Sequence, residues 1–483
     1  MVDVTPPAGL TAREAFLTRR IQVWGGSMLV LLGAAGLAAA FGLAAVAPGA
    51  ILAVPLTVVA AVGMVTALRL PGWGAATAVV LSLLLSGVAD DLPAGKAIFG
   101  FYLLVFLLTW HIPRWASGER LVVSWTDAGA ALLILLGIGL GLVLGVLFGN
   151  PVSEIVIQLQ AFVPVLLYFP IKQTCARERL GPELMAGALI VLGIVAATEN
   201  AILTRQALQD ATKLYEIIDV RVSYGEIMMM AATMLATGLL MSTRTWTGFA
   251  SYLPLFGIAV GGLILSKSRG FWVATVLALA VLFVMSRSQQ RRHLAGAGVV
   301  GFGALLVVAF VVAPQYVMLL GTGIAKRFLT LSTAASADLS LINRFAENAG
   351  VWRVIRENPV VGHGWGATYS YYSLLAQGSQ TWGFVHNAYF GVWLKLGLWG
   401  LMLVVWVWAG SAACGVLAVR DLRLSGRHRA LAGAAGASLL GIALVSYASS
   451  PFELADQMTV LTALWAVAQG TAQRARGQVP AAA

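Results

Sequence analysis

Long apolar segments, separated by short polar ones, recur along almost the whole chain. A helix that crosses a bilayer needs about 20 predominantly apolar residues, and fourteen windows approach this pattern. They run over 23–47, 49–68, 73–88, 97–112, 128–149, 152–171, 184–199, 222–241, 249–265, 270–285, 294–317, 387–419, 430–449 and 457–472. Several windows are short, so twelve spans with re-entrant segments are an alternative. The pattern predicts an all-α polytopic membrane protein.

Composition supports this prediction. Of the 483 residues, 59% are hydrophobic and 11% are charged, whereas soluble proteins carry about 25% charged residues. The net charge of +11 would suggest a nucleic-acid partner in a soluble protein, but in a membrane protein its distribution over the loops matters more. We therefore expect the lipid bilayer, and no nucleic acid, as a partner. Cys175 and Cys414 have no CxxC or histidine neighbours and are predicted to be inert thiols.

The basic residues predict an orientation. If the N-terminus lies in the cytoplasm and the spans alternate, cytoplasmic segments hold 19 Lys and Arg and the other side holds 12. Of those 12, only Lys96, Lys267 and Arg269 lie in short loops. Because cytoplasmic loops accumulate Lys and Arg, fourteen spans with both termini in the cytoplasm are predicted. The first apolar window lacks a small-residue cleavage site, so we expect a retained span and not a signal peptide.

Two outer segments, 200–221 and 318–386, are long enough to fold. The larger one divides the chain into a first part of the membrane bundle (1–317), a loop (318–386) and a last part of the bundle (387–483). Within the loop, helical spacing relates Leu341, Phe345, Ala349, Trp352 and Ile355, whereas Arg344, Glu347, Arg353 and Arg356 fall off that stripe. This predicts an amphipathic helix that lies against the membrane surface or the bundle mouth and ends at Asn358-Pro359.

Basic residues on the outer side are candidates for binding an anion. Lys267 and Arg269 occupy a tight hairpin, Ser-Lys-Ser-Arg-Gly, between two spans, and Arg221 opens another span on the same side. These side chains could merely reach toward lipid head groups. Alternatively, Gly270 allows the backbone to approach a ligand, and an arginine offers a planar fork that matches phosphate oxygens. Two arginines on one membrane face make a diphosphate clamp plausible.

His386 and Asn387 begin the twelfth window on that same side. Asn387 is a good helix N-cap, which is a purely structural explanation for the pair. A histidine at the mouth of a bundle can also orient or deprotonate a hydroxyl, because its ordinary pKa of about 6.5 is close to working pH.

Some motifs are absent from the sequence. It contains no HExxH, no Walker loop and no Cys/His ligand set, so neither a metal nor another cofactor is predicted. Asp90-Asp91 is the only adjacent acidic pair, and it is more typical of a solvated loop tip than of a metal site. Without an ATP site, any group transfer must use an activated donor.

One combination of motifs points to a known family. The Ser268-Arg269-Gly270 hairpin is followed by a large outer loop with Arg344, Trp352 and the stretch 357–364 (ENPVVGHG), and then by His386-Asn387 and a helix with two further glycines. Over about residues 221–410 this resembles the O-antigen ligase and O-antigen polymerase superfamily of bacterial membrane glycosyltransferases. The first five or six spans match it only as generic hydrophobic helices.

The resemblance implies a GT-C-like helical bundle in the bacterial inner membrane with its active site facing the periplasm. The donor would be a glycan on undecaprenyl diphosphate, and the acceptor another glycan or the lipid A core. By motif position, Arg221 and Arg269, with Lys267 beside them, would hold the diphosphate, and His386 would activate the acceptor hydroxyl without a metal. Arg344 and Asn387 are weaker candidates for binding substrate. The span count and length favour a surface polysaccharide polymerase slightly over a ligase, which is usually drawn with twelve spans.

Aromatic residues of the loop have two interpretations. Tyr369, Tyr371, Tyr372, Trp365 and Trp382 could stack on sugar rings, or they could be ordinary interfacial aromatics. A different class of function also stays open, namely a flippase or transporter of a lipid-linked oligosaccharide, or a permease for small solutes. A flippase should line a central cavity with charge, whereas the unusual charges here gather at one face.

Overall fold

The structure is a computed structural model that describes residues 53–85, 93–210, 225–243, 245–288, 290–296, 298–299, 303, 339–374 and 376–477. Predicted span 23–47, most of span 294–317, Asp90-Asp91 and the segment with Arg221 lie outside these residues. The chain divides into two compact units, Met1–Glu119 with Pro480–Ala483, and Arg120–Val479. The predicted loop 318–386 falls within the second unit.

The first unit contains a helical hairpin with a third helix. Its elements are α2 (Ala53–Arg69), α3 (Pro71–Leu81) with the 3-10 turn η2 (Ser82–Leu85), and α4 (Pro93–Ala116). The Tyr102 hydroxyl of α4 donates to the Gly74 carbonyl of α3 at 2.9 Å. The Phe106 ring also lies against Gly74, where an added Cβ would be 2.4 Å from the ring. Close packing of α3 on α4 therefore depends on this glycine.

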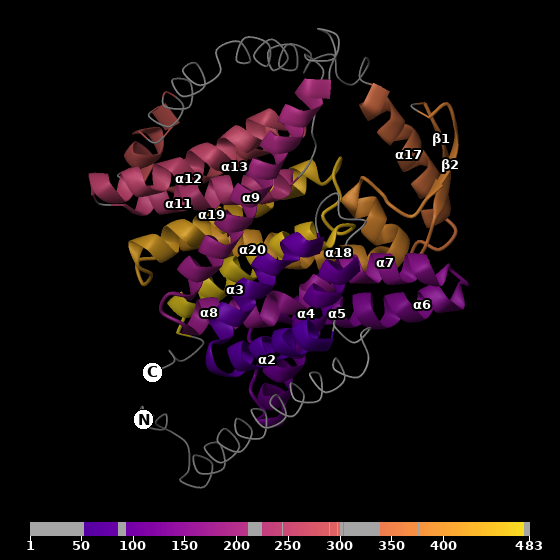
Figure 1. Ribbon diagram of the computed structural model, residues 1–483, viewed down its shortest axis with the longest axis horizontal. Coiled ribbons are helices and arrows are strands. Elements are labelled where there is room, and N and C mark those ends of the chain that lie inside the picture. Colours follow the sequence, from indigo (N-terminus) through magenta and orange to yellow (C-terminus); the bar gives the residue numbers. More distant parts are fainter. Residues whose placement is uncertain are drawn as a thin grey trace. The chain divides into compact units, whose positions relative to one another are not determined.

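The second unit is a bundle of helices with one β-hairpin (Figure 1). Its helices before the hairpin are α5 (Trp125–Ile134), the π-helical turn η4 (Leu135–Leu140), α6 (Gly141–Leu147), α7 (Val152–Phe162), the 3-10 turn η5 (Val163–Leu167), α8 (Tyr168–Arg177), α9 (Gly181–Asp210), α11 (Glu226–Ser242), α12 (Trp246–Leu265), α13 (Arg269–Met285) and α17 (Leu339–Ile355). The antiparallel strands β1 (Tyr369–Ser373) and β2 (Gly378–Trp382) follow, and then α18 (Ala388–Ala418), α19 (Gly426–Val445) and α20 (Ala455–Ala475).

Every predicted span within the described residues coincides with one of these helices or with a run of them. Six helical segments of the described chain are long and apolar enough to cross a membrane: Trp125–Leu147, Val152–Arg177, Gly181–Ala207, Trp246–Leu265, Ala388–Ala418 and Gly426–Val445. The apolar helices Pro71–Leu81, Glu226–Ser242 and Arg269–Met285 are shorter. The prediction of an all-α polytopic membrane protein is confirmed.

Helix α20 forms the interior of the second unit. It is buried along nearly its whole length and packs against α8, α18 and α19 (Figure 1). Glycines allow the surrounding helices to approach closely, since an added Cβ at Gly415 of α18 would lie 2.8 Å from the Cα of Gly436 in α19. Small residues at such contacts are typical of helices that associate in a membrane.

An ion pair is buried at the end of the bundle where α5 begins. Lys172 and Asp127 lie 3.1 Å apart and are 2% and 0% exposed. The Asp127 carboxylate also accepts hydrogen bonds from the Tyr168 hydroxyl and the Gln473 amide, each at 3.0 Å. Ser124 and Asp127 form a capping box at the start of α5. This cluster, which the sequence pattern does not predict, ties α5, α8 and α20 together.

The window 387–419, predicted as one span, is a helix with an internal break. Gly397 has φ +67° and ψ −172°, outside the helical region. The loop 359–366 satisfies the backbone groups that the break releases. His363 N–H donates to Leu394 O at 2.8 Å, Gly364 N–H to Lys395 O at 2.9 Å, and Leu398 N–H to Pro359 O at 3.0 Å. A broken helix at membrane depth needs such partners because lipid supplies none.

The loop reaches α18 through glycines with positive φ. Gly362, Gly364 and Gly366 have φ of +81°, +74° and +83°. At Gly364, an added Cβ would lie 2.1 Å from the backbone nitrogen of Gly145 in α6. Asn150 fixes the loop further, since its amide donates to the carbonyls of His363 and Trp365 at 2.9 and 2.8 Å. The glycine loop 359–366 thus connects α6 with α18 through backbone hydrogen bonds and close contacts.

We expect Gly397→Ala to destabilise the protein. The positive φ disfavours a side chain, and the new Cβ would lie 2.2 Å from the carbonyl oxygen of Val360, so a strain of about 1–3 kcal/mol or more follows. The measurement is thermal unfolding of the purified full chain in detergent. Gly257→Ala in α12 is the control, because nothing lies within 4 Å of its added Cβ. Equal unfolding temperatures for the two variants would contradict the role given to the break.

Candidate active site

The predicted amphipathic helix exists as α17. Of its apolar stripe, Ile355 is buried within the protein, whereas Phe345 is 45% exposed and Ala349 is exposed. Glu347, predicted on the polar face, is 1% exposed. The helix presents this carboxylate to the β-hairpin and to the turn before α18. A small core lies beneath, formed by Val351, Ile355, Ala367, Tyr369, Tyr371, Val385 and Leu394.

Glu347 binds His386 in two ways. One carboxylate oxygen accepts from the His386 backbone N–H at 2.8 Å, and the other lies 2.8 Å from the Nδ1 atom of the ring. The Tyr369 hydroxyl also donates to the first oxygen, at 3.0 Å. The His386 side chain is 34% exposed, while that of Glu347 is 1% exposed. With Nδ1 engaged by Glu347, Nε2 is the ring nitrogen that can make a further hydrogen bond.

In this cluster Glu347 favours its charged form, whereas Tyr369 keeps its proton. Burial raises the pKa of Glu347, but the hydrogen bonds and the charge of His386, together with the Tyr369 hydroxyl, outweigh it, so the pKa is lowered. Burial and the neighbouring carboxylate raise the pKa of Tyr369. Glu347 is therefore the hydrogen-bond acceptor, and the Tyr369 hydroxyl is a donor to it. The carboxylate holds the His386 ring at its Nδ1 atom.

Tyr369 and Trp365, two of the aromatic residues considered for sugar stacking, are structural in this arrangement. Tyr369 is 2% exposed, and its hydroxyl shares its one proton between Glu347 and the Phe384 carbonyl oxygen, which lies 2.7 Å away. Trp365 is 3% exposed and its indole N–H donates to Gly137 O at 2.6 Å. In contrast, Tyr372 and Trp382 are 58% and 42% exposed, so stacking on a sugar stays a proposal for these two.

A second buried ion pair lies beside the histidine. The Lys395 ammonium of α18 lies 2.5 Å from each carboxylate oxygen of Glu453, and both side chains are nearly inaccessible. Burial raises the pKa of Glu453, while the charge of Lys395 opposes that shift. Lys395 lies in α18, about two helical turns after His386. Glu453 belongs to the loop 446–454 between α19 and α20. The pair thus anchors this loop to the helix that starts at the histidine.

The same loop receives Arg344 and the start of α18. The Arg344 guanidinium of α17 donates to the Ala448 carbonyl, and the Ala388 N–H donates to Ser446 O at 2.9 Å. Asn387 is 2% exposed, and its side chain accepts from the N–H groups of Tyr389 and Phe390 at 3.1 and 3.3 Å. Asn387 is therefore the N-cap of α18, as one of the two interpretations predicted.

The basic hairpin lies at this end of the bundle as well. An added Cβ on Gly270 would be 3.1 Å from Val445, the last residue of α19, and the next residue, Ser446, contacts the start of α18. Lys267 is 2% exposed with φ +50°, and Arg269, the first residue of α13, is partly exposed. The hairpin and His386 therefore flank the same end of α19. Arg221 lies outside the described residues, a few positions before α11.

Sequence reasoning missed Glu347 and the pairing of Lys395 with Glu453. Glu347 lies off the apolar stripe of α17, and only its spacing of four from the buried residues Asn343 and Val351 connects it with the buried face. In the described part of the chain, no group of three or more His, Cys, Asp or Glu side chains could hold a metal ion.

Fold and site together define a polytopic membrane protein with a histidine–carboxylate pair and basic residues at one end of its bundle. Residues 254–405 match the family model for O-antigen ligase. The matched region contains the hairpin, α17, the glycine loop, His386 and Lys395, and it supports the O-antigen ligase family without distinguishing polymerase from ligase. No curated protein matches the chain.

The lowered pKa of Glu347 predicts an acid-sensitive contribution to stability. A carboxyl group with a depressed folded pKa stabilises the protein above its unfolded pKa of about 4.3, and this contribution is lost as pH falls through the folded value. The difference in unfolding temperature between wild type and Glu347→Gln should shrink as pH falls from about 6 to about 3.5. Glu357→Gln, at an exposed position, is the control and should show no such trend. A constant difference for Glu347→Gln would contradict the assigned charge.

Proposed function

We propose that the protein is a membrane glycosyltransferase that moves a glycan from undecaprenyl diphosphate to an acceptor hydroxyl at the periplasmic face. The observation that carries the proposal is the His386–Glu347 pair, which lies at the same end of the bundle as Lys267 and Arg269. The match of residues 254–405 to the O-antigen ligase model supports a membrane enzyme that acts on lipid-linked glycans.

The proposed reaction is a single inverting displacement. The acceptor hydroxyl oxygen attacks the anomeric carbon, and the bond from that carbon to the diphosphate oxygen breaks, with its electron pair leaving on undecaprenyl diphosphate. The hydroxyl proton passes to Nε2 of His386. Glu347, bonded at Nδ1, keeps the ring oriented and stabilises the imidazolium that forms. Such general-base assistance typically contributes a factor of about 10² to 10⁴ in rate.

The basic residues act on the leaving group. Negative charge grows on the diphosphate as the glycosidic bond breaks, and preorganised cations stabilise it most in the transition state. Arg269 and Arg221 would contact the phosphate oxygens, and the buried Lys267 lies in the same hairpin as Arg269. No step in this scheme uses a metal, because the arginines supply the positive charge.

The acceptor decides between polymerase and ligase. Length and the predicted number of spans favour a second lipid-linked glycan, and so a surface polysaccharide polymerase, over the lipid A core. A strain lacking the gene tests this on a blot of cell-envelope glycans. A single repeat unit on carrier or core means a polymerase, whereas long glycan on the carrier beside bare lipid A core means a ligase. Unchanged glycans would contradict both.

Substitution of the site residues should abolish transfer in that strain. His386→Ala, Arg269→Ala and Arg221→Ala, each expressed from a plasmid, are expected to leave glycan transfer reduced about 10²-fold or more, with protein level unchanged on an immunoblot. Arg353→Ala, an exposed position of α17, should restore wild-type glycans. Full activity of all three site variants would contradict the proposed mechanism.

Glu347 acts through His386 as a positioning residue. With purified enzyme, Glu347→Gln should lower kcat by at least about tenfold and leave the KM for the donor nearly unchanged, because the carboxylate does not touch the substrate. Its pH–rate profile should also shift, since the amide cannot stabilise the imidazolium. If Glu347 were only a packing residue, the pH profile of the variant would coincide with that of wild type.

A further inference from the structure

The ion pair between Lys395 and Glu453 is buried at the candidate site, yet the proposed reaction does not use it. The two side chains are 2% and 5% exposed, and the Lys395 ammonium lies 2.5 Å from each carboxylate oxygen. A buried ion pair contributes little to stability by itself, because the cost of removing both charges from water can exceed their attraction. Its position beside His386 therefore calls for a reason other than the stability of the fold.

Glu453 lies against the turn that carries His386. Its carboxylate accepts a backbone hydrogen bond from Val385, the residue directly before the histidine. The next N–H of the same turn, that of His386, donates to Glu347 at 2.8 Å. Two successive N–H groups are thus bound by two carboxylates from different elements, α17 and the loop 446–454. Together the two carboxylates fix the backbone from which the imidazole ring projects.

Gly391 of α18 makes room for the Glu453 carboxylate. An added Cβ at this glycine would lie 2.9 Å from the Oε1 atom of Glu453 and 3.4 Å from the Cβ of Val385. Gly391 and Lys395 are four residues apart and are therefore neighbours on one face of the helix. Glu453 thus contacts the first turns of α18 as well as the turn before them, and its place determines how the helix meets that turn.

The loop 446–454 is attached to both helices that flank the histidine, so Glu453 has a defined position. The carbonyl of the first residue of the loop accepts from the Ala388 N–H, at the start of α18, at 2.9 Å. The Arg344 guanidinium of α17 donates to the Ala448 carbonyl. A shift of Glu453 therefore acts on α17 and α18 together, which are the elements next to the histidine–carboxylate pair.

We propose that Glu453, held in place by Lys395, is a positioning residue for His386. The inference rests on the proposed function, in which His386 accepts the proton of the acceptor hydroxyl. Glu347 orients the imidazole ring, and Glu453 fixes the turn from which the ring projects. Because the Lys395 and Glu453 side chains are closed to solvent, neither contacts the substrate, and their effect on the reaction passes through the histidine.

Gly391→Ala tests the proposal without changing a charge. The new methyl group meets the end of a flexible side chain, so the Glu453 carboxylate must move while the fold is retained. With purified enzyme, kcat should fall at least about tenfold, since small misplacements of a catalytic group are costly, and the KM for the donor should stay nearly unchanged. Gly257→Ala, with nothing within 4 Å of its added Cβ, is the matched control and should retain the wild-type kcat.

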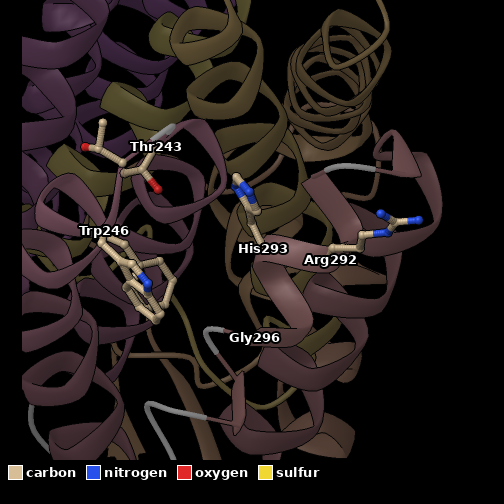
Figure 2. Close-up of a pocket in the computed structure, with 7 residues that line it drawn as sticks. Thr243, Trp246, Arg292, His293 and Gly296 are labelled. Carbon is tan, nitrogen blue, oxygen red and sulfur yellow. The ribbon is translucent and has the colours of Figure 1, made fainter.

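A second variant removes both charges together. Lys395→Met/Glu453→Met leaves neither partner as an unpaired buried charge, so the unfolding temperature should remain near that of wild type. Its kcat should nevertheless fall at least about tenfold, because the Val385 N–H loses its acceptor. The control is Arg292→Gln, which changes an exposed charge beside the pocket at the start of α12, the end of that helix away from the basic hairpin (Figure 2). A wild-type kcat in the folded double variant would overturn the proposal.

Carbethoxylation by diethylpyrocarbonate, measured on peptides by mass spectrometry, reports on the His386 ring without any glycan transfer. In Gly391→Ala the rate at His386 should rise at least about fivefold, because the ring is held less firmly against Glu347, while His428 should react as in wild type. An unchanged rate at His386 in the folded variant would overturn the proposal. The expected rise, in a protein whose wild type transfers no glycan, would support the action of Glu453 on the ring and contradict the proposed function instead.

Discussion

The candidate site depends on one carboxylate that is kept away from water. An ionised carboxylate is costly to bury unless donors surround it, and Glu347 meets this requirement with the His386 backbone, the His386 ring and the Tyr369 hydroxyl. These donors come from the β-hairpin and from the turn before α18. Placing them around one carboxylate of α17 determines where the histidine ring stands, so the orientation of the proposed base follows from the charge balance of the loop.

Satisfaction of polar groups also organises the surrounding membrane helices. The break at Gly397 releases carbonyls that the glycine loop recovers, and Lys395, just before the break, is neutralised by Glu453. At the other end, Asp127 and Lys172 neutralise each other among α5, α8 and α20. Charges within membrane helices are rare and usually paired. Here one pair supports the loop beside His386, and the other ties the bundle together at the end where α5 begins.

The helices were predictable from the sequence because a membrane imposes a length and an apolar composition on each of them. His386 and Asn387 could also be located, since they stand at the start of an apolar window in a region that resembles a known family. The burial of Glu347 in α17 could not be predicted. Hydrophobic spacing assumes that charge faces water, and Glu347 violates this rule because its donors lie far along the chain. The break at Gly397 was hidden for the same reason, since the residues that stabilise it belong to the preceding loop.

The most direct test of the account is an assay of the purified protein in liposomes with a polyprenyl-diphosphate-linked glycan and an acceptor glycan. If the account is correct, each glycan transferred releases one polyprenyl diphosphate, and the new glycosidic bond has the inverted anomeric configuration. Movement of the intact lipid-linked glycan across the bilayer, with no new bond and no released diphosphate, would contradict it and identify a flippase.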